Sequence, residues 1–308
     1  MQTIVLTGGT GLVGSSLYPL LLEKGFRVII FTRRLRPSTH EHLEYAHWDV
    51  DNGKIDTAAL LRADHIIHLA GAGIADKRWT ERRKQIIRDS RILSTRLLYN
   101  TLKEHGHRPQ AFICASATGF YGSSQEHSFR ESDPPSTDFI GETCRLWETE
   151  ALRLRDVCDR VVMMRTGLVL SHEGGVLKAL RKPFFLDLAA IMGNGNQWTS
   201  WIHLRDLCRL YFSAIGNKTW QGPYNAVAPE PVTHQTMVLS LAGILKGKYF
   251  VPVHIPSFLL RLALGEMGEE LLKSCKASAE KVKGTGFQFS YPTLQDALEA
   301  LFHQKEKP

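Results

Sequence analysis

The sequence begins with a glycine-rich loop, Thr7-Gly-Gly-Thr-Gly-Leu-Val-Gly14, that lies between a short apolar run and a helical pattern. Residues 3–6 predict a buried strand, and residues 12–24 predict a helix that Gly25 ends. A loop of this kind directs backbone N–H groups and the positive end of the helix dipole to one point, which suits a phosphate. Its glycines allow the turn, the approach of a ligand and the packing of helix on strand. The loop therefore predicts dinucleotide binding by Gly8, Gly9, Thr10, Gly11, Leu12 and Val13.

A second apolar run, residues 27–32, predicts the next strand, and Arg33 and Arg34 follow it directly. In a dinucleotide-binding fold, this position faces the ribose of the adenosine. An acid there would accept hydrogen bonds from the 2′-hydroxyl, whereas arginine accommodates a 2′-phosphate. Because two arginines stand here with no acid beside them, the sequence predicts NADP(H) rather than NAD(H).

Apolar runs and helical patterns alternate over the first 170 residues. Further strands are expected at 43–48, 65–70, 110–115 and 160–165, and helices at 56–62, 80–104 and 138–156. This alternation is typical of an α/β protein with a Rossmann-type doubly wound parallel sheet. Beyond residue 170, glycines and prolines divide the chain into short elements. We therefore expect an NADP-binding domain at 1–170 and a smaller C-terminal α/β substrate lobe at 171–308, with the chain crossing back around 198–216.

The composition is that of a globular protein, with 43% hydrophobic and 22% charged residues among 308. No apolar run approaches the length of a membrane span, and the N-terminus lacks the layout of a signal peptide. We therefore expect a cytoplasmic protein without a membrane partner. The net charge is +7, but the basic stretch 77–91 is interrupted by Glu81 and Asp89. That pattern indicates a solvated helix face, and we expect no nucleic-acid partner.

Neither a disulfide framework nor a metal site is indicated. The five cysteines are widely spaced and include no CxxC pair. Two histidine pairs, His40 with His42 and His65 with His68, have no third ligand at a recognisable spacing. We expect no bound metal.

Candidate catalytic hydroxyls follow the fifth predicted strand, at the edge where open α/β sheets place their chemistry. The stretch Ser116-Ala-Thr-Gly-Phe-Tyr-Gly122 offers Ser116, Thr118 and Tyr121. Polar and aromatic residues of the expected cleft are predicted to face a small-molecule substrate, namely Trp79, Gln197, Trp201 and His203.

In their order along the chain, these motifs resemble those of extended short-chain dehydrogenases/reductases. The resemblance rests on the glycine loop, His68-Leu-Ala-Gly71, the turn at 116–122, Arg165-Thr-Gly167 and Trp201-Ile-His203. It is closer to one atypical branch, the epimerase family proteins similar to bacterial YfcH and the human epimerase family member. Features of that branch are Lys77-Arg-Trp79, Ser90-Arg91, Trp147-Glu148, Gly174-Gly175, Gly195-Asn-Gln197, Asn225 and Gly286-Phe287. Together these motifs cover nearly the whole chain.

The resemblance implies that further residues hold NADP(H). They are Thr32 beside Arg33, Leu69 and Ala70 after the fourth strand, Arg91 on the following helix, and Val169. The small residues from Gly71 to Gly73 would let the cofactor lie against the backbone.

The catalytic pair of the superfamily is missing. Standard members use a serine and a Tyr-xxx-Lys pair in which the lysine lowers the pKa of the tyrosine. The corresponding helix here has Phe139 with Thr143 or Cys144, and Tyr99 with Lys103 lies on the wrong helix. Counted without gaps, the superfamily's serine falls on Ala117, so Ser116 or Thr118 would replace it, while Glu148 and His203 are further candidates.

Two classes of function therefore remain. The first is an NADP(H)-binding, epimerase-like oxidoreductase of the atypical extended branch, which acts on a small polar substrate without the Tyr-xxx-Lys pair. The second is a non-catalytic NADP(H)-binding sensor or scaffold protein. The missing pair weakens the hypothesis that the protein is a full nucleotide-sugar epimerase, because epimerisation by transient oxidation needs a base that reverses its role.

Overall fold

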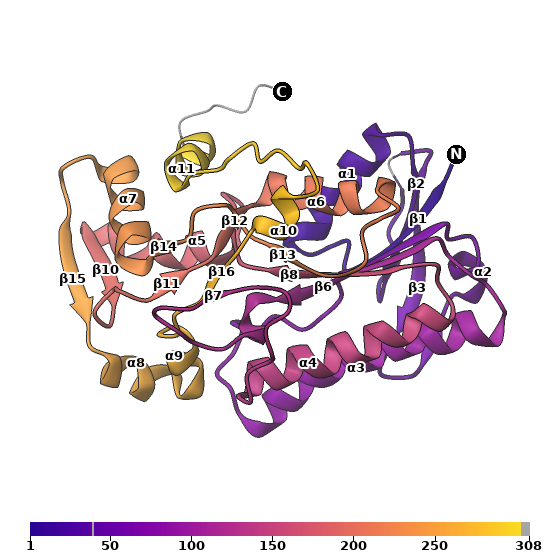
Figure 1. Ribbon diagram of the computed structural model, residues 1–308, viewed down its shortest axis with the longest axis horizontal. Coiled ribbons are helices and arrows are strands. Elements are labelled where there is room, and N and C mark those ends of the chain that lie inside the picture. The colour runs from indigo at the N-terminus through magenta and orange to yellow at the C-terminus, as the bar shows by residue number, and fades with distance from the viewer. Residues whose placement is uncertain (39, 303–308) are drawn as a thin grey trace.

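The computed structural model describes residues 1–38 and 40–302, and its centre is an eight-stranded sheet (Figure 1). The strand order is β13-β8-β6-β5-β1-β2-β3-β4, and every neighbouring pair is parallel except β3 with β4. The strands are β1 (Thr3–Thr7), β2 (Arg27–Thr32), β3 (Leu43–Asp49), β4 (Lys54–Ile55), β5 (His65–His68), β6 (Ala111–Ala117), β8 (Val161–Thr166) and β13 (Gly222–Ala226). The predicted α/β doubly wound sheet is confirmed.

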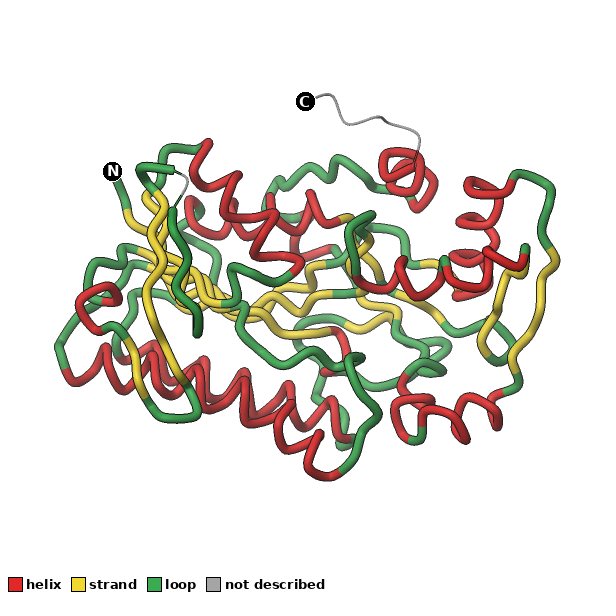
Figure 2. The backbone as a smooth tube through the Cα atoms, turned by 180° about the vertical axis from the view of Figure 1, so that it is seen from behind, coloured by secondary structure: helices red, strands yellow, loops and turns green. Residues whose placement is uncertain are grey.

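Helices cover both faces of this sheet, which is why its strands are apolar on both sides. Helices α1 (Leu12–Glu23) and α6 (Leu204–Gly216) lie side by side on one face, and α3 (Glu81–Glu104) and α4 (Phe139–Leu152) lie on the other (Figures 1 and 2). Alternate residues of β1 pack on opposite faces of the sheet. Ile4 and Leu6 lie in the hydrophobic cluster with α1 and α6, and Val5 lies in the cluster with α3.

Polar side chains that accept hydrogen bonds from backbone N–H groups begin the helices on these faces. Asp56 accepts a hydrogen bond from the N–H of Ala59 at the start of α2 (Thr57–Leu60), Thr80 accepts one at the start of α3, and Asp138 accepts two at the start of α4. Each cap satisfies backbone donors that the first helical turn leaves free.

The glycine loop is tightly packed against its own helix and against the end of β5. Gly8 has φ +70°, and a Cβ there would lie 2.7 Å from the backbone carbon of Leu69. A Cβ on Gly14 would lie 2.3 Å from the carbonyl oxygen of Gly8. Only glycine therefore lets the loop and the first turn of α1 approach so closely.

A second, smaller lobe is built from short elements after residue 166. They are β9 (Leu168–Leu170), α5 (Gly175–Leu180), η3 (Lys182–Leu186), β10 (Leu188–Met192), β11 (Trp198–Thr199), β12 (Trp201–His203), β14 (Val232–Thr233), α7 (His234–Lys246), β15 (Val251–Ile255), α8 (Ser257–Leu264), α9 (Glu266–Glu270), β16 (Lys276–Ala277) and α11 (Leu294–Phe302). Helix α10 (Glu280–Lys283) packs instead on β13 of the main sheet. They form two-stranded sheets, such as β10 with β15 and β11 with β14.

Between these elements the chain returns to the first domain. Helix α6 packs on α1, and β13 becomes the edge strand of the main sheet beside β8. The predicted division at residue 170 is thus interrupted by a return that reaches Ala226, beyond the expected 198–216. No helix in the described ranges is both long and apolar enough to cross a membrane.

The substitution Gly14→Ala should destabilise the protein, because its methyl group would meet the backbone of the loop at Gly8 and Gly9. We expect a loss of about 1–3 kcal/mol in the free energy of unfolding, measured by urea denaturation. Gly243→Ala in α7 is the matched control, since no heavy atom lies within 4 Å of its added Cβ. That control should gain up to about 1 kcal/mol from helix propensity. Equal stability of the Gly14 variant and the unchanged protein would contradict the packing described here.

Candidate functional site

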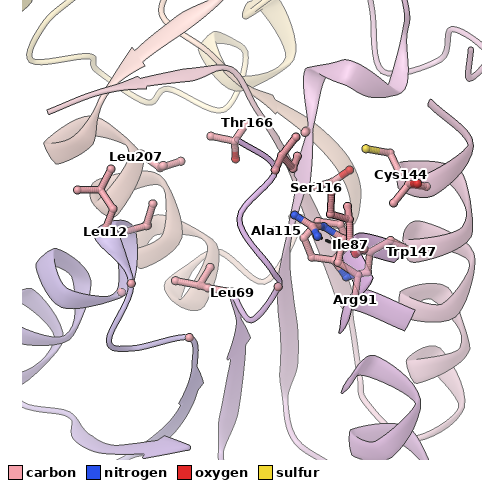
Figure 3. Close-up of a pocket in the computed structure, with 18 of the residues that line it drawn as sticks. Leu12, Leu69, Ile87, Arg91, Ala115, Ser116, Cys144, Trp147, Thr166 and Leu207 are labelled. Carbon is pink, nitrogen blue, oxygen red and sulfur yellow. Dashed lines mark hydrogen bonds between the residues drawn. The ribbon is translucent and has the colours of Figure 1, made fainter. Parts of the chain in front are cut away.

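A cavity of about 310 Å³ opens at the carboxyl ends of β1, β5 and β6, between the glycine loop and helices α3 and α4 (Figure 3). Figure 3 shows Leu12 and Leu207 on one side of it, and Ser116, Arg91 and Trp147 on the other. Its lining residues are Gly8, Gly11, Leu12, Val13, Gly14, Leu69, Gly71, Ile74, Ile87, Arg91, Ala115, Ser116, Ala117, Ile140, Thr143, Cys144, Trp147, Thr166, Leu207 and Tyr211. A mostly apolar wall with a few polar groups is typical of a cofactor site.

Seven of the predicted cofactor residues line this cavity. They are Gly8, Gly11, Leu12, Val13, Leu69, Gly71 and Arg91. Sequence reasoning missed other lining residues, including Ile87, Thr166, Leu207 and Tyr211. Leu207 and Tyr211 are one helical turn apart on α6, so the crossing of α6 over the sheet, rather than a motif, brings them here.

The ends of β1 and β5 are held together beside the cavity by Thr7 and His68. The Thr7 hydroxyl lies 2.7 Å from Nδ1 of His68, and Nε2 of His68 lies 3.1 Å from the hydroxyls of both Ser94 and Thr95 on α3. Burial lowers the pKa of His68 to about 3, with a smaller contribution from the charge of Arg91. His68 is therefore a neutral structural residue, and the described residues contain no group of three or more potential ligands that could hold a metal ion.

The other predicted cofactor residues lie outside the cavity wall. Gly9, Thr10, Thr32, Ala70 and Val169 are absent from its lining.

Arg33 and Arg34 are exposed at the carboxyl end of β2. Because β2 is the parallel neighbour of β1, they stand on the same edge of the sheet as the glycine loop. The Thr32 hydroxyl fixes this turn, since it hydrogen-bonds both the N–H and the carbonyl of Arg34.

Arg91 brings a positive charge to the cavity from α3. Its side chain is buried and donates to the carbonyl oxygens of Ala72 and Ile87, and its guanidinium lies 5.1 Å from the ring centre of Trp147. Within the described part of the chain, no carboxylate lies within 4 Å of it. Burial lowers the pKa of Arg91 from its ordinary value. A buried cation with neutral partners is expensive, which indicates a site for a ligand with acceptor oxygens.

Behind Ser116 lies a buried ion pair between Glu148 on α4 and Arg165 on β8. Arg165 donates from Nε and Nη2 to the two carboxylate oxygens of Glu148, both at 2.8 Å. Ser116 donates its hydroxyl proton to Glu148 at 2.7 Å. The lone pairs of the Ser116 hydroxyl thus remain to accept a hydrogen bond from a ligand.

Tyr121 belongs to the same network rather than to the cavity wall. Its hydroxyl accepts a hydrogen bond from Nη1 of Arg165 at 2.9 Å and donates to the side-chain carbonyl of Asn225 at 2.5 Å. Burial raises the pKa of Tyr121 above its ordinary value despite the nearby charge of Arg165. Its hydroxyl is therefore fully engaged in joining β8 and β13.

Helix α4 presents no tyrosine or lysine to the cavity. Its lining residues are Ile140, Thr143, Cys144 and Trp147, and the Thr143 hydroxyl donates to the carbonyl of Phe139. Burial raises the pKa of Cys144 to about 12, so its thiol stays protonated.

The only Tyr-xxx-Lys of the chain lies elsewhere. Tyr99 is buried on α3, where its hydroxyl donates to Asp156 at 3.2 Å and accepts from Lys103 at 3.0 Å. It packs between α3 and the end of α4 and contributes nothing to the cavity wall.

The C-terminal segment packs behind the cavity wall through α9, where Met267 lies against the cluster that contains Ile140 and Cys144, and no sequence motif predicted this contact. Lys273 bridges Asp138, at 2.9 Å, and Glu270. On the other side of α9, Lys84 pairs with Glu266 at 2.6 Å. Burial raises the pKa of Glu270 above its ordinary value.

Thr118 begins η1 (Thr118–Phe120) directly after β6, and its carbonyl oxygen accepts a hydrogen bond from the thiol of Cys275 at 3.6 Å.

Of the four predicted substrate-side residues, only Trp79 lies beside the cavity. It packs in one cluster with Ile140 and Cys144, and its indole donates to the carbonyl of Ile74. Of the other three, Gln197 and Trp201 stabilise the second lobe and His203 begins the helix that returns to the first domain. Gln197 donates to the carbonyl of Met192, Trp201 donates to that of Glu230, and the His203 ring caps α6. These residues lie away from the cavity because β11 pairs with β14 and β12 pairs with β9, both in the second lobe.

Comparison with known proteins identifies relatives over the whole length. Residues 4–226 match the NAD dependent epimerase/dehydratase family, and residues 255–301 match a domain of unknown function, DUF1731. The chain is 35% identical over 296 residues to an epimerase family protein of Mycobacterium leprae, covering 96% of this chain and 94% of that protein. It is 34% identical over 306 residues to the epimerase family protein YfhF of Bacillus subtilis, covering 99% of each chain.

A solved structure with the same arrangement is that of the human epimerase family protein SDR39U1 with NADPH. It has a TM-score of 0.86 at 27% identity, and the match covers 98% of this chain and all of that chain. These matches confirm the resemblance predicted from the motifs.

The substitution Glu148→Gln should be strongly destabilising, because it leaves the buried Arg165 without a countercharge. We expect a loss of about 3–5 kcal/mol in the free energy of unfolding, measured in urea. The double variant Glu148→Leu with Arg165→Met should lose much less stability, since it leaves no unpaired charge buried. The exposed pair Glu44 with Arg62 gives the control, in which Glu44→Gln should cost less than about 1 kcal/mol. A double variant less stable than Glu148→Gln would contradict this account.

Proposed function

Because the chain belongs to the NAD dependent epimerase/dehydratase family, we propose that it binds NADP(H) and acts as an epimerase-like oxidoreductase of the atypical extended branch. Its substrate is a small polar molecule bound beside the cofactor. The observation that carries this proposal is the cavity itself, where the glycine loop, Arg91 and Ser116 meet at the carboxyl edge of the sheet. Open α/β sheets bind their ligands at this edge.

The residues present suit a dinucleotide. The glycine loop leaves room that a Cβ would fill, and it lies at the N-terminus of α1, where backbone N–H groups favour phosphate oxygens. Arg91 supplies a charge that has no carboxylate partner within 4 Å in the described chain. Exposed Arg33 and Arg34 suit the 2′-phosphate of NADP(H). When bound, the cofactor would supply or accept the hydride.

Among the candidate hydroxyls, we propose Ser116 as the one that contacts the bound molecules. It lines the cavity, whereas Thr118 and Tyr121 do not. Since its proton is donated to Glu148, Ser116 would accept a hydrogen bond from an N–H or O–H group of the ligand and so orient it. The proton that accompanies hydride transfer would come from water or from a group of the substrate. No tyrosine or lysine of α4 lines the cavity, and burial raises the pKa of the lining Tyr211 far above its ordinary value.

The alternative is a non-catalytic NADP(H)-binding sensor or scaffold protein. The engagement of Tyr121 with Arg165 and Asn225, and the high pKa of Cys144, favour it. The presence of a cavity wall beyond the glycine loop, formed by α4 and α6, favours the enzyme.

A nucleic-acid partner is not proposed. The basic residues of 77–91 are dispersed among acids: Lys84 pairs with Glu81 and Glu266, and Arg83 pairs with Asp76.

The substitution Arg33→Ala should weaken NADPH binding by about 10–100-fold, since charge-assisted hydrogen bonds to a phosphate are lost. The affinity for NADH should stay unchanged, because NADH lacks the 2′-phosphate. Arg36→Ala, an exposed arginine in the same loop, is the control and should leave both affinities unchanged. Calorimetric titration measures each of them. Equal affinity of the unchanged protein for NADPH and NADH would overturn the proposed cofactor preference.

Activity is tested by following NADPH consumption across a panel of carbonyl compounds and nucleotide sugars. The enzyme proposal expects turnover of at least one class, and Ser116→Ala should slow that turnover about a hundredfold while NADPH still binds. Tight NADPH binding with no turnover across the panel would favour the sensor instead.

A further inference from the structure

The end of the second lobe farthest from the N-terminus is formed by β10, β15 and α8 (Figure 1). This end exposes large apolar side chains. The exposed fractions are 88% for Phe185, 75% for Leu186 and 84% for Tyr249, and they are 64% for Phe258 and 74% for Leu262 on α8. We call these five residues the apolar end face. Single exposed apolar residues are ordinary, whereas such a concentration marks an interaction surface.

Two distant segments of the chain form this face. The N–H of Val251 donates to the carbonyl of Asp187 at 2.8 Å, which places Tyr249 beside the end of η3. From there β15 runs parallel to β10, with Val251 and Val253 exposed, and leads directly into α8. The apolar residues therefore lie along the β10–β15 pair, with Phe185, Leu186 and Tyr249 at its start and Phe258 and Leu262 just beyond its end.

This part of the chain is strongly basic. Residues 176–191 and 244–264 contain six basic residues and one acid, Asp187. The basic residues are Lys178, Arg181, Lys182, Lys246, Lys248 and Arg261.

The acids near this face are already paired. Asp187 lies 2.7 Å from Lys246, and Glu269 of α9 lies 3.5 Å from Arg261. Lys182 and Lys248 are exposed, and no carboxylate of the described residues lies within 4 Å of either. The face thus presents apolar side chains together with unpaired positive charge.

A second copy of this chain fits the face poorly. The backbone N–H and C=O groups of β15 point toward β10 at Val251, Val253 and Ile255. Those of Pro252 and His254 therefore point away from β10, along the open edge. Pro252 has no N–H, and a proline on an open edge opposes strand pairing. Lysines of like charge would also meet across a two-fold axis.

We propose that the apolar end face docks on an anionic lipid surface. Aromatic and aliphatic side chains of the face would enter the boundary between headgroups and acyl chains, while Lys182 and Lys248 approach lipid phosphates. Apolar area and basic charge add in such binding, and neither is sufficient alone. The exposed lysines Lys182 and Lys248 favour an anionic lipid surface over an uncharged apolar partner.

This proposal departs from the expectation that the chain has no membrane partner. That expectation rested on the search for long apolar runs, which detects spanning segments and not a face assembled from two distant segments. The end face is built from elements that do not line the cofactor cavity, so it stands independently of the proposed function.

The test is cosedimentation of the full chain with vesicles. We expect the protein to bind vesicles containing phosphatidylglycerol and to remain free with phosphatidylcholine alone. The double variant Lys182→Glu with Lys248→Glu should bind at least about 25-fold more weakly, from about fivefold for each lysine removed. Phe185→Ser with Leu186→Ser should bind more weakly as well. The charge control, Lys54→Glu with Lys218→Glu, changes the net charge equally at exposed sites elsewhere and should bind normally.

A second measurement avoids any loss of folding in these variants. The native cysteines are buried or half-buried, so Leu186→Cys adds an accessible thiol for an environment-sensitive dye. Its emission should shift to the blue on phosphatidylglycerol vesicles, and that of labelled Leu35→Cys, also at an exposed site, should not. The proposal is overturned if the protein does not bind these vesicles. It is also overturned if Lys54→Glu with Lys218→Glu weakens binding as much as Lys182→Glu with Lys248→Glu does. It is also overturned if sedimentation equilibrium shows a dimer that Phe185→Ser with Leu186→Ser separates.

Discussion

The buried ion pair between Glu148 and Arg165 is the interaction on which the site depends. It joins α4 to β8, and through Ser116, Tyr121 and Asn225 it also fixes β6, the turn after it, and the edge strand β13. Charges removed from water are tolerated only when their hydrogen-bonding capacity is satisfied. Because the network meets this requirement, the wall of the cavity is rigid on the side where Ser116 stands.

The same network explains how the site differs from that of the wider superfamily. In standard members a lysine makes a tyrosine acidic enough to exchange a proton. Here the cation nearest the cavity is Arg91, which stacks on Trp147, and the nearby phenol of Tyr121 has a raised pKa. The hydroxyls of Ser116 and Thr143 have already donated their protons to the protein. The cavity therefore offers acceptor lone pairs and one guanidinium, a combination suited to holding a polar ligand.

Much of the first domain could be predicted from the sequence because local and long-range requirements agree there. A strand with apolar residues on both faces, such as residues 3–7, can only lie inside a sheet covered twice, and caps such as Thr80 and Asp138 mark where helices begin. The glycine loop was predictable for the same reason, since its backbone geometry demands glycine at position 8. The part of the cavity wall that α6 contributes was not predictable. Leu207 and Tyr211 look like ordinary core residues of an amphipathic helix, and Trp201 and Gln197 look like site residues but pack the second lobe.

The two ion pairs that flank α9 affect how the protein can be divided. Lys84 with Glu266 attaches α9 to α3, and Lys273 with Asp138 attaches it to the start of α4. The segment that matches DUF1731 is therefore fastened to both α3 and α4. A fragment ending at Ala226 would keep the full main sheet but expose the apolar surface that Met267 covers. The first domain and its C-terminal extension thus form one structural unit, because the extension covers apolar surface of the first domain.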